Sequence, residues 1–145
     1  MRIACLVLVL TVSAHAQSAA SKPAECAEYA AKLESCAPYV CTFTHPMTGA
    51  QLQRKIVGLA DGACVTSEAM PGKRTMQCAL PTNMRKAVAT FFRKTQAAET
   101  AGQVVGGSLT LGANGKAETT STVDGKLVGN PLQQALASGA CKIGG

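Results

Sequence analysis

The chain has 145 residues, a formal net charge of +6, seven cysteines, two histidines and no tryptophan. This length suits one domain rather than two. So few histidines exclude a catalytic zinc site built on several of them, and a core with only five aromatic residues favours reinforcement by disulfides.

Residues 1–16 have the pattern of a secretory signal peptide. Met1-Arg2 precedes an apolar run over residues 3–12, and Ala14-His15-Ala16 provides a small-x-small cleavage site. The apolar run is about half of the ~20 residues that span a bilayer, so we expect cleavage after Ala16 and no transmembrane anchor. Cys5 would leave with the leader. The six remaining cysteines then favour a disulfide-stabilised periplasmic or secreted protein.

Residues 17–100 are expected to form a disulfide-stabilised α+β core. The pattern predicts an N-terminal helix over 23–35 and then a four-stranded antiparallel meander over 40–45, 51–59, 63–69 and 74–80. Asp61-Gly62 is a strong hairpin signal between the second and third strands. Thr82 is the expected N-cap of a packed amphipathic helix over 83–96, with an apolar stripe of Met84, Ala87, Val88, Phe91 and Phe92.

Residues 101–145 form a glycine-rich C-terminal extension, with ten of the fourteen glycines and no aromatic residue. Turns at Asn114-Gly115 and Asp124-Gly125 predict strands over 108–113, 116–123 and 126–128. Asn130-Pro131 predicts the start of a helix over 132–138. We expect Cys141 to tie this extension back to the core, and the extension to be more mobile than residues 26–96.

The sequence constrains the positions of the cysteines too little to assign all of the disulfides. Cys26 and Cys36 lie ~15 Å apart on one helix, too far to join each other. A three-residue loop over 70–72 would place Cys64 opposite Cys78, so we expect these two to form a disulfide. Further bridges among Cys26, Cys36, Cys41 and Cys141 have three possible connectivities. The absence of a CxxC pair argues against both zinc binding and thioredoxin-like redox chemistry.

No residue stands out as catalytic, cofactor-binding or metal-ligating. His45 is the single histidine beyond the leader and lies beside Pro46 in a predicted turn. The eight acidic residues are scattered: Glu25, Glu28, Glu34, Asp61, Glu68, Glu99, Glu118 and Asp124. Two carboxylates that face one cleft would favour a hydrolase, whereas a shallow surface would favour a binding protein.

Basic residues come as adjacent pairs at Arg54-Lys55, Lys73-Arg74, Arg85-Lys86 and Arg93-Lys94. A basic surface favours an anionic partner such as phospholipid headgroups or an acidic protein. Neighbours on a strand point to opposite faces, so Arg54-Lys55 alone cannot form one patch, and ordinary solvated charge explains these pairs equally well. The pairs lack interleaved aromatic residues, which disfavours nucleic acid as a partner.

Several segments resemble small exported proteins of proteobacteria: Cys41-Thr42-Phe43-Thr44-His45-Pro46, Val57-Gly58-Leu59-Ala60-Asp61-Gly62-Ala63-Cys64, Val123-Asp124-Gly125-Lys126 and Asn130-Pro131-Leu132-Gln133. This resemblance implies a periplasmic home and nothing about mechanism. We therefore expect a non-enzymatic exported binding or accessory protein of the cell envelope that needs no cofactor, with an envelope protein or an anionic surface as its partner. The alternatives are a small secreted hydrolase using scattered carboxylates and a secreted factor acting on another cell's envelope.

Overall fold

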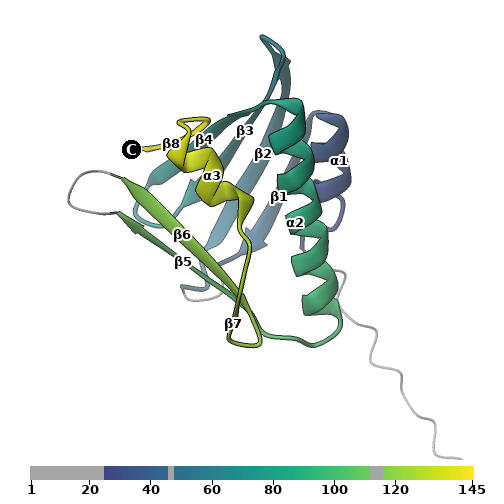
Figure 1. The fold of residues 1–145 in the computed structure, drawn as a ribbon, viewed down its shortest axis with the longest axis vertical. Coiled ribbons are helices and arrows are strands. Elements are labelled where there is room, and N and C mark those ends of the chain that lie inside the picture. The colour runs from purple at the N-terminus through teal and green to yellow at the C-terminus, as the bar shows by residue number, and fades with distance from the viewer. Residues whose placement is uncertain (1–24, 46–47, 112–115) are drawn as a thin grey trace, which may run out of the picture.

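The computed structural model describes residues 25–45, 48–111 and 116–145. The expected signal peptide, residues 1–16, lies outside the described residues. Over the described part the fold is α+β, as the sequence predicts, with three helices and two antiparallel sheets (Figure 1).

The main sheet contains the predicted meander of β1 (Tyr39–Thr44), β2 (Gln51–Ala60), β3 (Ala63–Met70) and β4 (Arg74–Leu80). Asp61 and Gly62 turn the chain between β2 and β3 with φ angles of 50° and 77°, the left-handed pair that a two-residue hairpin turn requires. A fifth strand that the sequence analysis did not predict, β8 (Cys141–Gly144), pairs antiparallel with β4.

Three helices cover one face of this sheet, as Figure 1 shows. They are α1 (Tyr29–Ser35), α2 (Thr82–Thr100) and α3 (Pro131–Ala137). The prediction of Thr82 as the N-cap of the long helix is wrong: Thr82 is the first helical residue and Pro81 occupies the cap position with extended backbone angles. Asn130 does cap α3, because its Oδ1 accepts a 2.9 Å hydrogen bond from the backbone N–H of Leu132.

A small second sheet lies beside the helices and contains β5 (Val105–Leu111), β6 (Ala117–Val123) and β7 (Lys126–Val128). Asp124 and Gly125 form the predicted turn between β6 and β7, with φ angles of 49° and 75°. The other predicted turn, at Asn114-Gly115, lies outside the described residues. In Figure 1 the β5–β6 hairpin stands on the same side of the main sheet as α2 and α3.

The core lies between the main sheet and the helices. Its largest fully buried side chains come from α1, β2, β3, β4 and α2: Leu33, Ile56, Cys64, Leu80 and Val88. Ala135 of α3 and Cys141 of β8 are buried in the same cluster, so the C-terminal third contributes to this core. Ala87 of the predicted α2 stripe is exposed, whereas Ala89 is buried.

Three disulfides join the six cysteines of the described chain: Cys26–Cys41, Cys36–Cys64 and Cys78–Cys141. The first two attach the residues on either side of α1 to β1 and β3. The third attaches β8 to β4, where the two cysteines are directly opposed, and ties the C-terminal extension to the core as expected.

The predicted Cys64–Cys78 disulfide is wrong, and the reason is the loop between β3 and β4. Met70 pairs with Arg74, so the loop comprises residues 71–73 rather than 70–72. Gly72 and Lys73 both take the left-handed conformation, with φ angles of 77° and 60°. This loop shifts the pairing by two residues, so Cys64 lies opposite Leu80.

Candidate functional site

Arg54 of β2 points inward, into the space between the main sheet and α2. Alternation along the strand places it on the same face as Leu52 and Ile56, while Lys55 points to the opposite face. Only 14% of the Arg54 side chain is exposed. A buried guanidinium requires both a counter-charge and partners for its donors.

Three aromatic rings surround the Arg54 guanidinium. Its Cζ atom lies 4.9 Å from the ring centroid of Tyr29, 4.6 Å from that of Phe43 and 4.5 Å from that of Phe92. Tyr29 and Phe92 also pack edge to face, with centroids 5.2 Å apart. Each ring lies within the ~6 Å at which a cation is attracted to an aromatic face. We call these three rings the aromatic cage.

Glu68 of β3 supplies the counter-charge, because the Nε of Arg54 donates a 2.7 Å hydrogen bond to its Oε2. Burial acts to lower the pKa of Arg54, but the charge and hydrogen bond of Glu68 outweigh it, with smaller contributions from Tyr29 and Glu99, and the net pKa is raised. Arg54 therefore stays cationic inside the fold. Burial also raises the pKa of Tyr29 to about 12, an effect that Arg54 opposes and Glu68 reinforces.

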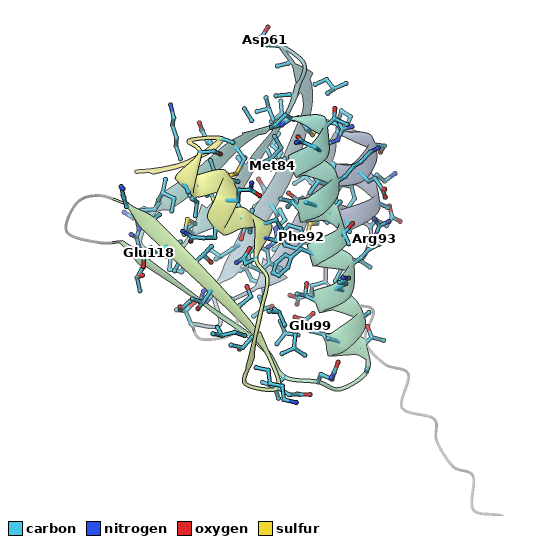
Figure 2. The ribbon with its side chains drawn as sticks, in the orientation of Figure 1. Asp61, Met84, Phe92, Arg93, Glu99 and Glu118 are labelled. Atoms are coloured by element: carbon cyan, nitrogen blue, oxygen red, sulfur yellow. A yellow bond between two sulfur atoms is a disulfide. The ribbon has the colours of Figure 1, made fainter. Side chains whose placement is uncertain are left out.

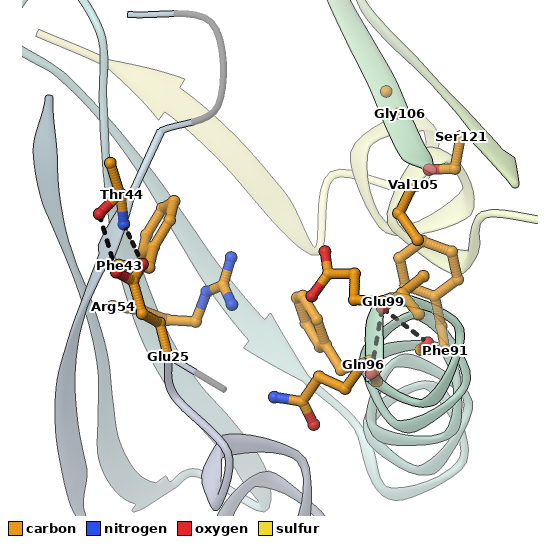
Figure 3. Close-up of a pocket in the computed structure, with 13 residues that line it drawn as sticks. Glu25, Phe43, Thr44, Arg54, Phe91, Gln96, Glu99, Val105, Gly106 and Ser121 are labelled. Carbon is orange, nitrogen blue, oxygen red and sulfur yellow. Dashed lines mark hydrogen bonds between the residues drawn. The ribbon is translucent and has the colours of Figure 1, made fainter. Parts of the chain in front are cut away.

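A cleft of about 580 Å³ opens beside Arg54. Its walls come from β1 and β2, from the second half of α2 and from the β5–β6 hairpin; its lining is Glu25, Phe43, Thr44, Arg54, Phe91, Phe92, Thr95, Gln96, Glu99, Val105, Gly106, Gly107 and Ser121. Figure 3 shows the terminal amino groups of Arg54 pointing into this space. The volume lies within the range of ~300–1,000 Å³ typical of small-molecule sites.

The wall formed by β5 has no side chains at Gly106 and Gly107. A Cβ at Gly106 would come within 2.8 Å of Thr122 Oγ1, which is closer than two such atoms can approach. A Cβ at Gly107 would lie 3.1 Å from the Thr120 carbonyl oxygen. The two glycines thus allow close pairing with β6, and both line the cleft.

The cleft continues along the hairpin into a second cavity of about 290 Å³. Phe43, Arg54, Phe91, Gly107 and Ser121 line both spaces. Ser121 is buried, and its Oγ accepts a 3.0 Å hydrogen bond from Asn130 Nδ2. Arg54 therefore lies where the two cavities meet.

Two carboxylates, those of Glu25 and Glu99, line the cleft. Both oxygens of Glu25 are engaged: Thr44 donates from its backbone N–H to Oε2 and from Oγ1 to Oε1, the latter at 2.8 Å. Glu99 lies on the opposite wall, and Figure 3 shows its carboxylate turned toward the guanidinium of Arg54. The Glu25 carboxylate is thus held by hydrogen bonds to Thr44, whereas the Glu99 carboxylate faces the open cleft.

The other acidic residues lie elsewhere. Asp61 lies at the tip of the β2–β3 hairpin, far from Glu99 in Figure 2, and Glu118 lies on β6. Glu28 pairs with Lys32 at 3.8 Å and Glu34 pairs with Arg93 at 2.7 Å. His45 follows β1, lines the second cavity and accepts a hydrogen bond at Nδ1 from the Thr48 N–H.

The four basic pairs are distributed over several elements. Arg54 is inside the fold, Lys73 and Arg74 lie at the β3–β4 turn, and the other two pairs are on α2. Arg54 is the candidate site residue that the sequence pattern did not single out. Its position between Leu52 and Ile56 on one strand face was the available signal, and its charge favoured an exposed position instead.

In the part of the chain that the structure describes, no group of three or more metal-ligating side chains is close enough to hold an ion. No helix among the described residues has the length and apolar character needed to cross a bilayer. Comparison of the chain with protein-family models, with curated proteins and with solved structures found no match. A function for this protein is therefore inferred from its fold and its cleft.

Proposed function

We propose that this is a non-enzymatic exported binding protein of the cell envelope, periplasmic or secreted, whose ligand occupies the cleft beside Arg54. One observation carries the proposal: a buried guanidinium, fixed by Glu68 and the aromatic cage, turns its terminal amino groups into a cavity of about 580 Å³. Such a preorganised group can bind a ligand without losing much side-chain entropy.

The disulfides support an exported location. All six cysteines of the described chain pair with one another, a state that an oxidising compartment maintains and the cytosol does not. The expected signal peptide over residues 1–16 agrees with this location. A rigid site on a disulfide-linked scaffold suits binding outside the cytosol.

A cleft-filling variant tests the proposal. Thr95 lines the cleft, and within the described residues its Oγ1 donates only to carbonyl oxygens of its own helix, those of Phe91 and Phe92. Thr95→Phe should therefore fill the cleft without removing a hydrogen bond between elements. The full chain is expressed in a bacterial host and purified from the periplasm or the medium without denaturation. The small molecules that it releases on unfolding are then measured by mass spectrometry.

Thr100→Phe is the matched control. Thr100 lies on the same helix, is exposed, and makes the same kind of hydrogen bond, from its Oγ1 to the Gln96 carbonyl at 2.8 Å, but it does not line the cleft. We expect wild type and Thr100→Phe to release a common molecule that Thr95→Phe lacks. Identical small-molecule content in all three would overturn the proposal.

A hydrolase is the second candidate, because Glu25 and Glu99 line one cleft. Acid–base catalysis needs two carboxylates free to exchange protons with the substrate. The engagement of both Glu25 oxygens by Thr44 opposes that role. A panel of hydrolase substrates, assayed with the wild type and with Glu99→Gln, distinguishes the two functions. Turnover by the wild type that Glu99→Gln abolishes would establish the enzyme.

A further inference from the structure

We infer that the ligand of this cleft is a zwitterion of amino-acid or dipeptide size with an apolar side chain, its carboxylate on Arg54 and its ammonium group toward Glu99. This inference rests on the proposed function and specifies its ligand. It follows from three features of the cleft: the Arg54 donors that Glu68 does not use, the facing carboxylate of Glu99 and the apolar rings that line the same space.

The carboxylate position follows from Arg54. Its Nε donates to Glu68, and its Nη1 and Nη2 donate no hydrogen bond to another described residue. These terminal groups point into the cleft (Figure 3). A guanidinium presents its N–H donors as a planar fork that matches the two oxygens of a carboxylate. The free side of this fork therefore suits a ligand carboxylate.

The ammonium position follows from Glu99. Its side chain faces Arg54 across the open cleft, yet the two make no ion pair within the described structure. They are close enough for the charge of Glu99 to act on Arg54. A cation and an anion that face each other across a cleft are complementary to a ligand that carries both charges. The negative group of such a ligand would lie at Arg54 and its positive group at Glu99.

The charges of Arg54 and Glu99 favour a zwitterion over a ligand with a single charge. Glu68 already opposes the charge of Arg54 inside the fold, and Glu99 places a second carboxylate on the wall that faces it. A purely anionic ligand would leave Glu99 without a counter-charge, and a purely cationic one would leave the Arg54 donors without acceptors. A zwitterion satisfies both groups and adds no net charge.

The apolar part of the ligand follows from the rings. Phe43, Phe91 and Phe92 line the cleft beside Arg54, and Phe91 and Phe92 pack with their centroids 5.8 Å apart. Burial of an aliphatic side chain against such rings is favourable at ~25 cal/mol per Å². Leucyl-leucine therefore carries all three complementary features.

The test compares four probes by isothermal titration calorimetry: leucine, leucyl-leucine, N-acetyl-leucyl-leucine and leucyl-leucine amide. Loss of the carboxylate in the amide should weaken binding by about 10- to 100-fold, the usual effect of losing a charged hydrogen-bonded partner. Because Glu99 is exposed, loss of the ammonium in the acetylated probe should weaken binding by only about 3- to 5-fold.

Two variants test where the carboxylate and the ammonium group of the ligand bind. Glu99→Gln should weaken leucyl-leucine by the same factor of about 3 to 5 and leave the acetylated probe unchanged. Arg54→Lys keeps the buried cation but removes the planar fork, so it should weaken leucyl-leucine and leave the amide unchanged. Glu28→Gln, which changes an exposed carboxylate on the chain segment before α1, is the control and should leave all four affinities unchanged.

The outcomes separate this inference from the proposed function. Acetylated or amidated probes that bind as tightly as leucyl-leucine would overturn the zwitterion, as would an absence of binding by all four probes. If the zwitterion is overturned but Thr95→Phe still lacks a molecule that wild type and Thr100→Phe release, the proposed function stands with a different ligand class. If the zwitterion is overturned and all three proteins release the same molecules, the proposed function fails as well.

Discussion

The Nε of Arg54 lies 2.7 Å from Oε2 of Glu68, and the two side chains retain only 14% and 22% of their exposure. When one partner of a buried pair is removed, the other becomes an uncompensated buried charge, which typically costs about 3–5 kcal/mol. We expect Glu68→Gln to lower the free energy of unfolding by about 3 kcal/mol, measured by urea denaturation at pH 7.

The pair of Glu34 and Arg93 provides the control for this prediction. It has the same chemistry and the same 2.7 Å separation between Arg93 Nη1 and Glu34 Oε2, but both side chains are exposed. Solvent screens such pairs, so Glu34→Gln should leave the urea midpoint nearly unchanged. Equal effects of the two substitutions would show that burial does not strengthen the Arg54 pair.

Tyr29 makes stability depend on pH at the alkaline end. Burial raises its pKa in the folded protein to about 12, from 10.0 for an exposed phenol. Below pH 10 both states hold the proton, and between pH 10 and 12 the unfolded chain releases it first, so stability falls as the pH rises. Two pKa units correspond to about 2–3 kcal/mol.

Tyr29→Phe removes this titration. We expect the difference in the free energy of unfolding between wild type and Tyr29→Phe to be constant from pH 7 to about 9.5 and then to shift against the wild type as the pH rises further. Denaturation of both proteins in parallel cancels the contributions of lysines and other shared groups. A difference that stays flat to pH 11 would contradict the buried phenol.

Much of the fold could be predicted because its signals are local. Asp61-Gly62, Asp124-Gly125 and Asn130-Pro131 mark turns and a helix start through the conformational preferences of two adjacent residues, and the structure contains all three. Strand β8 could not be predicted in this way. Cys141 pairs with Cys78 across 63 residues, and no local pattern in Cys141–Gly144 identifies β4 as its neighbour.

The candidate site was less predictable than the fold. Disulfide partners depend on strand register, and a displacement of the β3–β4 loop by one residue was enough to place Thr66 rather than Cys64 opposite Cys78. The burial of Arg54 could not be predicted from strand register either, because it depends on contacts between distant segments. Its burial depends on Glu68 and on rings from α1, β1 and α2, which come together only in the folded chain.

The Cys78–Cys141 disulfide closes the longest loop of the three, with a sequence separation of 63 against 15 for Cys26–Cys41. The chain-entropy relation gives about 4 kcal/mol for the longer loop and about 3 kcal/mol for the shorter one. We expect the double variant Cys78→Ala/Cys141→Ala to lose more stability in urea than Cys26→Ala/Cys41→Ala. Non-reducing peptide mapping of each variant confirms that the two remaining pairs are unchanged, and the reverse order of stabilities would contradict the loop-length argument.

The C-terminal third should not open as one unit. Sheet β5–β6–β7 has three strands and includes Gly106 and Gly107, whereas β8 pairs with β4 and is covalently linked to it through Cys141. Short sheets of this kind are marginal unless packed against other elements, and local opening occurs below the global free energy. We therefore expect the hydrogen-bonded amides of β5, β6 and β7 to exchange with solvent first, and those that join β8 to β4 to exchange together with the core. Hydrogen exchange followed by mass spectrometry checks this order. Loss of protection in β8 at the same rate as in β5 would mean that the disulfide does not hold the last strand in the main sheet.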